Sequence, residues 1–110
     1  MAEREDIRQI ALALPEAVEA DHHGMPSFRV GGKIFCTLHA EEHRRCMVKL
    51  DPEDQHNLCD DAAVTRVPGY WGLKGSTFVA YEQVTRDRLA ELIRLAWATA
   101  APKRLLQPGP

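Results

Sequence analysis

The fold is decided by residues 27–50, SFRVGGKIFCTLHAEEHRRCMVKL, in which apolar and polar side chains alternate along three short runs. Alternation with a period of two is typical of a half-buried strand. Gly31-Gly32 separates the first two runs and predicts a two-residue hairpin turn, because glycine tolerates positive φ. The polar segment 40–45 joins the second run to the third. These residues therefore predict three antiparallel strands in a meander.

The same alternation assigns the side chains of this meander to two faces. One face is apolar and should pack against helices; it holds Phe28, Val30, Ile34, Cys36, Leu38, Cys46, Val48 and Leu50. The other mixes cations, an aromatic ring and a methionine without a carboxylate; it holds Arg29, Lys33, Phe35, Thr37, His39, Met47 and Lys49. We expect the second face to be open and to carry the function.

Helical periodicity appears on both sides of the meander. Residues 4–14 predict a helix that Pro15 ends, and residues 86–100 predict a helix that Thr85 caps. Their apolar stripes are Ile7, Ile10, Ala11 and Leu14 in the first, and Leu89, Leu92, Ile93, Ala96 and Trp97 in the second. A short middle helix begins at 51–54, where an aspartate can cap and a proline suits the first turn.

Strands and helices in this order predict an α+β fold. Residues 64–67 and 77–81 supply one or two further strands, separated by a loop or wide turn over 68–75. We expect a two-layer sandwich, with an antiparallel sheet of four or five strands and the N-terminal, middle and C-terminal helices on one face. The chain should form a single domain over residues 1–110, with its core in about 5–105 and a flexible tail at 106–110.

Composition excludes several classes of protein. Of the 110 residues, 45% are hydrophobic and 27% are charged, which is typical of a globular domain. The formal net charge of −2 argues against a strong, non-specific nucleic-acid coat. The first residues lack the apolar core of a secretory signal, and Cys36, Cys46 and Cys59 are an odd number without CxxC spacing. We therefore expect reduced thiols and a cytoplasmic location; a monomer is consistent with these features, which leave the oligomeric state open.

Nucleic-acid binding is the leading functional prediction from the residues. Arg29, Lys33 and Lys49 should share the open sheet face, with Arg66 and Lys74 on connections that border it. Trp71 adds an aromatic side chain that could stack on bases. Cations spaced in this way can contact phosphates, while aromatic rings add contact area.

Metal and covalent chemistry are less well supported. His22 and His23 are adjacent and would point in opposite directions on a strand, while His39 and His43 flank a predicted turn. We therefore predict no metal site, no cofactor and no enzymatic activity; His23 with a nearby carboxylate is the one acid/base candidate. The alternative function is a module that binds a protein partner or a small ligand in a cleft near Tyr70, Trp71 and His23.

Several segments, taken in order, resemble the MmcQ/YjbR family. The stretch HGMPSFRVGGKIF over 23–35 is similar to the family pattern G-x-P-x-F-x-V-x-G-K-x-F. The segments LALPE at 12–16, LDP at 50–52 and PGYWG at 68–72 follow the family order. The closing segment from Trp97 through APKRL at 101–105 resembles the family ending W-x-x-x-A-P-K-R-L. Together these segments cover about residues 5–105.

The resemblance implies both a fold and a role. It implies a compact α/β fold related to the frataxin-like topology, called a double wing, and a DNA-binding role without catalytic residues. One position departs from the family pattern: Ser76 stands where many members have an aromatic residue after the glycine matching Gly75. The expectation that follows is a small, non-enzymatic DNA-binding protein that uses the open sheet face and its loops.

Overall fold

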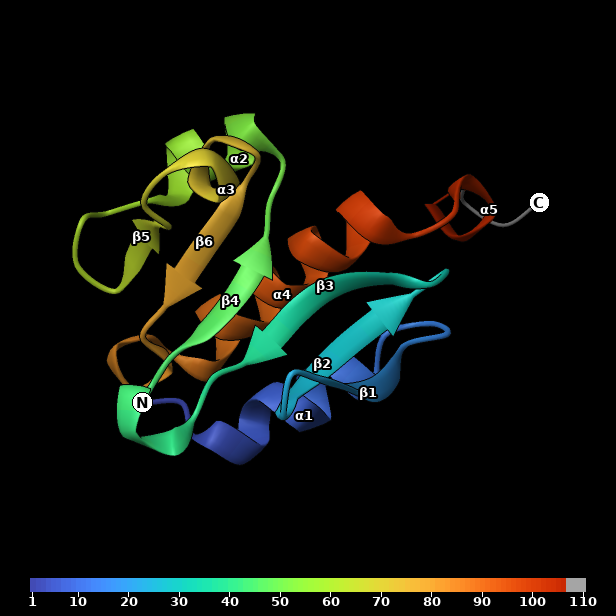
Figure 1. Ribbon diagram of the computed structural model, residues 1–110, viewed down its shortest axis with the longest axis horizontal. Coiled ribbons are helices and arrows are strands. Elements are labelled where there is room, and N and C mark those ends of the chain that lie inside the picture. Colours follow the sequence, from blue (N-terminus) through green and yellow to red (C-terminus); the bar gives the residue numbers. More distant parts are fainter. Residues whose placement is uncertain (107–110) are drawn as a thin grey trace.

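The computed structural model describes residues 1–106 and contains a six-stranded sheet with helices (Figure 1). The helices are α1 (Arg4–Leu12), α2 (Pro52–Leu58), α3 (Tyr70–Leu73), α4 (Arg86–Ala100) and α5 (Lys103–Leu106). Short 3-10 turns occupy η1 (Glu41–His43) and η2 (Tyr81–Gln83). The strands are β1 (Val18–His22), β2 (Met25–Val30), β3 (Lys33–Leu38), β4 (Cys46–Lys49), β5 (Val64–Arg66) and β6 (Ser76–Val79).

The sheet is antiparallel throughout, in the order β1-β2-β3-β4-β6-β5. Helix α4 packs on β2, β3 and β4 and contacts α1, so these two helices cover one face of the sheet. Figure 1 shows α4 running behind the middle strands. The predicted α+β sandwich is confirmed, with six strands instead of four or five.

The predicted helix stripes form the core. Ile7, Ile10 and Ala11 are buried on α1, and the stripe from Leu89 to Trp97 is buried on α4. The Thr85 side chain accepts a hydrogen bond from the Arg88 backbone at 3.1 Å, which confirms the predicted N-cap. Apolar side chains at this spacing form one stripe of a helix and therefore pack against the sheet together.

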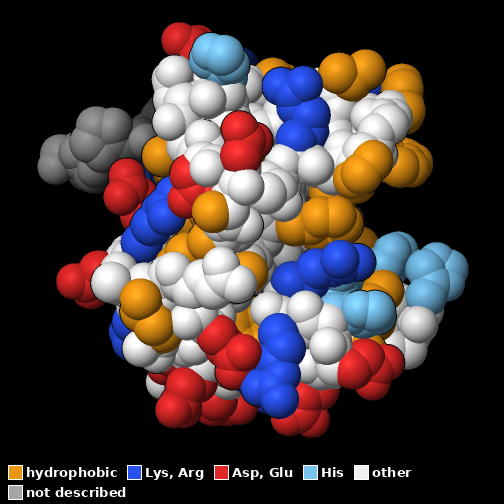
Figure 2. Space-filling model, turned by 90° about the vertical axis from the view of Figure 1, so that its left-hand side faces the viewer, with side chains coloured by type: hydrophobic (Ala, Val, Ile, Leu, Met, Phe, Trp, Pro, Cys, Tyr) orange, Lys and Arg blue, Asp and Glu red, His pale blue; other side chains and the backbone are white. Residues whose placement is uncertain are grey.

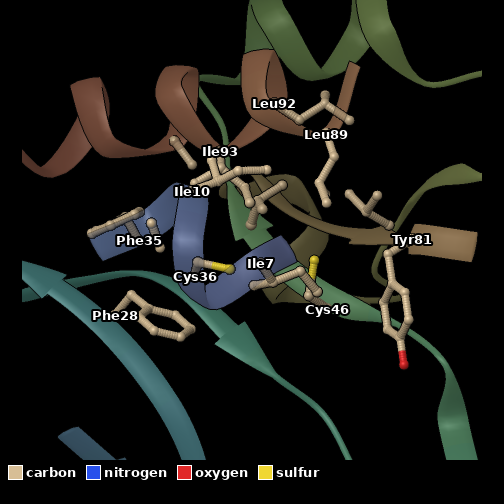
Figure 3. Packing of buried hydrophobic residues seen from close by; sticks show 14 of the residues in the cluster. Ile7, Ile10, Phe28, Phe35, Cys36, Cys46, Tyr81, Leu89, Leu92 and Ile93 are labelled. Atoms are coloured by element: carbon tan, nitrogen blue, oxygen red, sulfur yellow. The ribbon is translucent and has the colours of Figure 1, made fainter. Parts of the chain in front are cut away.

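A β-bulge corrects the face assignment in β3. The register between β2 and β3 shifts at Phe28/Arg29, so Cys36 lies opposite Phe28 while Ile34 lies opposite Arg29. The extra residue, Phe35, is fully buried in the core, where Figure 3 shows it near Ile10 of α1. A bulge puts one additional residue into the strand and shifts the alternation. The predicted faces of Phe35 and Ile34 were therefore wrong: Phe35 lies in the core and Ile34 on the open face.

The bulge also moves Lys33. Lys33 lies opposite Val30, which is buried on the helix-covered face, whereas Arg29 is on the other face. Directly opposed residues in an antiparallel pair point to the same side of the sheet. The prediction that Lys33 shares a strand face with Arg29 and Lys49 was therefore wrong.

Two further elements differ from the sequence-based expectation. The edge strand β1 was not predicted, because its largely exposed residues lack an alternating apolar pattern. Helix α3 lies inside the segment 68–75, which was expected to be a loop or wide turn. At the C-terminal end, Leu106 belongs to α5, and residues 107–110 of the predicted tail lie outside the described residues. Of the helices in residues 1–106, none has both the length and the apolar character needed to cross a membrane.

Candidate functional site

A groove opens where β3 and β4 separate. Residues 36–38 of β3 pair with residues 46–48 of β4, antiparallel to each other. The first residues of β3, 33–35, have no partner on β4. The groove has a volume of about 1310 Å³. Its walls come from β2, β3, β4 and the α2–α3 corner, which is the part formed by helices α2 and α3 where they contact each other. Helix α4 contributes Leu95, Ala98, Thr99 and Ala100. The Thr99 hydroxyl donates to the Lys49 carbonyl at 2.9 Å, which ties α4 to the end of β4.

The groove brings together most of the cations that the sequence singled out. Its lining includes Arg29, Lys33, Lys49 and Lys74, which we call the groove cations. Arg29 and Lys49 reach it from the open sheet face, Lys33 from the start of β3 and Lys74 from the segment after α3. Figure 2 views the molecule from the opposite end of the sheet and shows hydrophobic side chains above and histidine side chains below a notch in its right-hand outline. Four of the five cations that the sequence singled out therefore line one groove, and Lys33 does so from the helix-covered side of β3.

The groove cations differ from most arginines elsewhere in the charges around them. In residues 1–106, none of the groove cations forms a salt bridge with a carboxylate. By contrast, ion pairs hold arginines outside the groove: Arg8 with Glu5 and Glu19, Arg44 with Glu82, Arg86 with Asp6, Arg88 with Asp60, and Arg104 with Glu16. Asp51 and Asp54 also line the groove, at its α2 side. The positive charge of the groove cations is therefore available to an anion.

Arg29 is held in position by neutral groups of the β1–β2 hairpin. Its Nε donates to the Ser27 hydroxyl at 3.2 Å and its Nη2 donates to the Asp21 carbonyl at 3.2 Å. Ser27 in turn donates to the Ala20 carbonyl at 2.9 Å. These bonds orient the guanidinium without neutralising its charge, so Arg29 can still bind an anion bidentately.

The α2–α3 corner presents two aromatic side chains to solvent. Tyr70 is 63% exposed and Trp71 is 64% exposed, and their rings meet edge to face with centroids 5.5 Å apart. Trp71 lines the groove, whereas Tyr70 lies beside it with the Lys74 ammonium 5.4 Å from its ring centre. Exposed rings of this kind offer faces for stacking.

A buried amide and two close backbone contacts hold this corner. The Gln55 Nε2 donates to the carbonyls of Gly72 and Ser76 and to the Thr77 hydroxyl, at 3.0, 3.1 and 3.0 Å. A Cβ on Gly72 would lie 1.7 Å from the Val67 carbonyl oxygen, and one on Gly75 would lie 1.9 Å from that of Leu50. The backbone can approach this closely only because both positions are glycine.

Thr37 contributes an unsatisfied hydroxyl to the groove wall. The residue is 2% exposed, lies opposite Ser27 and Met47 on the strand face that carries Arg29, and lines the groove. Its Oγ1 is buried and has no hydrogen-bond partner among residues 1–106. Leaving a buried hydroxyl unpaired costs about 1–3 kcal/mol.

The groove offers little for covalent or metal chemistry. The Cys36 thiol lines it, but its hydrogen bond with Cys46 and its burial raise its pKa well above the usual value. A thiol with a raised pKa is a poor nucleophile. No group of three or more His, Cys, Asp or Glu side chains within residues 1–106 could hold a metal ion. His22 and His23 line the groove with ring centroids 4.4 Å apart.

Next to the groove, part of the open face is already covered. The Arg45 guanidinium lies 4.0 Å from the centre of the Phe78 ring, and its Nε donates to His39 Nδ1 at 2.9 Å. Burial, followed by the nearby charges of Arg45 and His43, lowers the pKa of His39. His39 does not line the groove although the alternation placed it on the same face, because it follows Leu38 at the paired end of β3 and β4 and the groove opens at the other end.

The groove contains some of the residues predicted from the sequence and lacks others. Arg66 lies opposite Thr77 on the helix-covered side of the sheet and does not line the groove, so the structure does not join it to the predicted cluster. The alternative cleft near Trp71 and His23 coincides with the same groove, without Tyr70. Thr37 and Thr99 were missed as site residues, since only the packing of neighbouring elements shows that they reach the groove.

Comparisons with known proteins give a family and a fold. The family model described as YjbR matches residues 12–99. The crystal structure of Deinococcus radiodurans protein DR2400, with the family-model domain DUF419, is similar with a TM-score of 0.72 and 20% sequence identity. That match covers 94% of this chain and 88% of the DR2400 chain, and at this identity it shows the fold alone. No curated protein matches this chain.

Proposed function

We propose that this chain, which belongs to the YjbR family, binds DNA through the groove between β3 and β4. The observation that carries the proposal is the set of groove cations: none of the four pairs with a carboxylate in residues 1–106, whereas five of the nine arginines outside the groove do. Phosphates can take the place of the missing carboxylates. Trp71 is exposed and can stack on a base. The Arg29 guanidinium, which the hairpin already orients, can make a bidentate contact with a phosphate.

The proposed role is binding without catalysis. The groove holds a cysteine whose pKa is raised and histidines that have no hydrogen bond to a carboxylate among the described residues. Positive charge on this one surface is compatible with the net charge of −2, because the sign of the charge on one surface can differ from that of the whole chain.

The salt dependence of binding tests this proposal. Labelled oligonucleotides of one sequence, as single strand and as duplex, are titrated with protein at several salt concentrations. We expect Lys33→Ala/Lys49→Ala to reduce the log–log salt slope by roughly 1.4 for a single strand or 1.8 for a duplex, because two phosphate contacts are lost. Absence of binding to either form at ~50 mM salt would overturn the proposal.

A matched control separates local from overall charge. Arg86→Ala/Arg104→Ala removes the same number of positive charges, but from side chains paired with Asp6 and Glu16. We expect this variant to keep the wild-type salt slope. Equal losses of slope in the two double variants would mean that net charge, and not the groove, governs binding.

A second candidate function rests on the exposed apolar side chains of α3. Tyr70, Trp71 and Leu73 form an apolar patch beside the groove, which supports a module that binds a protein partner or a small ligand. The volume of about 1310 Å³ exceeds the 300–1,000 Å³ typical of small-molecule sites, which favours an extended ligand. Docking on the patch should change little between low and high salt, whereas DNA binding should weaken steeply.

A further inference from the structure

We infer that the groove takes an unpaired strand of DNA in preference to a duplex, with at least one base stacked on Trp71. This inference rests on the proposed DNA binding and specifies the form of the ligand. Three features of the described residues support it: the concave placement of the charges, the exposure of the aromatic rings, and the unpaired hydroxyl of Thr37.

The charges line a recess. The groove cations surround the space between β3 and β4, and α4 contributes to its wall behind these strands. A duplex carries its phosphates on a convex cylinder, and proteins that read it usually insert a protruding helix or ribbon into a groove about 12 Å wide. A single strand is narrow and flexible enough to follow a recess lined with cations.

The aromatic side chains have free faces. Trp71 is 64% exposed where it lines the groove, and Tyr70 beside it is 63% exposed. In a duplex the base faces are stacked on each other, so they are not accessible to a protein ring. Unpaired bases can stack on such a ring whatever their sequence. Trp71 therefore gains a partner only when the strand is unpaired.

Thr37 lines the groove and carries, just beneath its surface, a hydroxyl that is unpaired within the described residues. Its hydroxyl has no partner in residues 1–106, and the strand face on which it lies also carries Arg29. In a DNA strand the phosphate and deoxyribose oxygens accept hydrogen bonds and the base edges accept or donate them, so several of its atoms suit a hydroxyl. The volume of about 1310 Å³ is larger than a typical site for one small molecule, which fits several consecutive nucleotides better than a mononucleotide.

The test compares two forms of one sequence. A fluorescently labelled 12-nucleotide strand of mixed sequence and its duplex are titrated at ~50 mM salt. We expect the single strand to bind at least about tenfold more tightly than the duplex. We expect Trp71→Ala to weaken single-strand binding by about tenfold, because one stacked base is lost, and Trp71→Phe to restore most of the affinity.

Control variants and intrinsic fluorescence locate the effect. Leu73→Ala changes a side chain of the same helix that is equally exposed, at 65%, but does not line the groove, so its affinity should match the wild type. Trp97, the other tryptophan, is buried and its Nε1 donates to the Pro15 carbonyl. Quenching of tryptophan fluorescence by the unlabelled strand should therefore come from Trp71 and disappear in Trp71→Phe.

Each outcome bears on one of the two proposals. Equal or tighter binding of the duplex would overturn this inference and leave the proposed DNA binding in place. Binding of neither form would overturn the proposed function itself. Preference for the single strand without an effect of Trp71→Ala would overturn the stacking part of the inference.

Discussion

Two buried threonines, one on each face of the sheet, differ in their hydrogen bonds. On the helix-covered face, Thr77 is fully buried; its hydroxyl donates to the Gly75 carbonyl at 2.9 Å and accepts from Gln55 at 3.0 Å. On the groove face, Thr37 is almost as deeply buried, yet its hydroxyl has no partner among residues 1–106. Most buried polar groups in proteins are paired, as Ser27 is on the same face opposite Thr37, so the unpaired hydroxyl singles out Thr37 within the groove lining.

Charged side chains also differ in whether they have a partner. On other surfaces, arginines such as Arg88 and Arg104 lie against carboxylates, whereas Arg29 and the lysines of the groove do not in the described part of the chain. Removing a satisfied group should therefore lower stability and leave binding unchanged. Removing an unsatisfied groove group should weaken binding at little or no cost in stability.

Gln55 gives the largest expected change in stability. Gln55→Leu keeps the approximate volume but removes the amide that donates to Gly72, Ser76 and Thr77. We expect the free energy of unfolding to fall by about 2–3 kcal/mol, because buried acceptors lose a donor. Urea denaturation measures it. Gln9→Leu on the exposed surface of α1 is the control and should change stability by less than about 0.5 kcal/mol.

The outcome for Gln55 sharpens the comparison of the two faces. A fall of less than ~1 kcal/mol would show that the α2–α3 corner is held by packing and not by the buried amide. The glycines at 72 and 75 would then carry that role, because their backbone lies against the carbonyls of Val67 and Leu50.

The sequence predicted the regular parts of the fold well. The stripes of α1 and α4, the Gly31-Gly32 turn and the alternation in β4 all follow from local spacing, and the structure confirms them. Edge strand β1 was not predicted, because its residues are mostly exposed and therefore show no alternation of apolar and polar side chains. Local sequence is informative where one side of an element is buried and the other is not.

The site was less predictable because it depends on how elements meet. The bulge at Phe28/Arg29 depends on how two strands pair. It places Phe35 in the core and Lys33 on the helix-covered side of β3, where the alternation alone did not predict them. The separation of β3 from β4 then let Lys33 line the groove with Arg29 and Lys49. Thr37 was expected on the open face, but only the packing shows that its hydroxyl is unpaired.

A pair of threonine substitutions tests the comparison directly. Thr77→Val should lower the free energy of unfolding by about 1–2 kcal/mol, because satisfied hydrogen bonds are lost. Thr37→Val replaces an unpaired hydroxyl with a methyl group of similar size and should raise it by about 1 kcal/mol. Denaturation of both variants measures this opposite sign. If both variants lose stability equally, Thr37 has a partner in solution and is no mark of a ligand face.

The smallest expected effect concerns Asp60, a fully paired carboxylate away from the groove. Its Oδ1 accepts from the backbone of Val64 and Ala62, both at 2.9 Å, and its Oδ2 accepts from Arg88 at 3.0 Å. The backbone hydrogen bonds from Val64 and Ala62, followed by the interaction with Arg88, lower the pKa of Asp60 to about 2. A carboxyl whose pKa is lowered by folding stabilises the folded state at neutral pH and loses this contribution as the pH falls through about 2.

Asp60→Asn should therefore reduce stability at pH 7 and make little difference at pH 2. Because the side chain is 35% exposed, solvent screening limits the expected loss to less than about 1 kcal/mol. Thermal denaturation of both proteins across this pH range measures the difference, and the DNA titration should give the wild-type affinity. A loss of DNA affinity without a loss of stability would contradict the division of the charges into structural pairs and groove cations, because Asp60 does not line the groove.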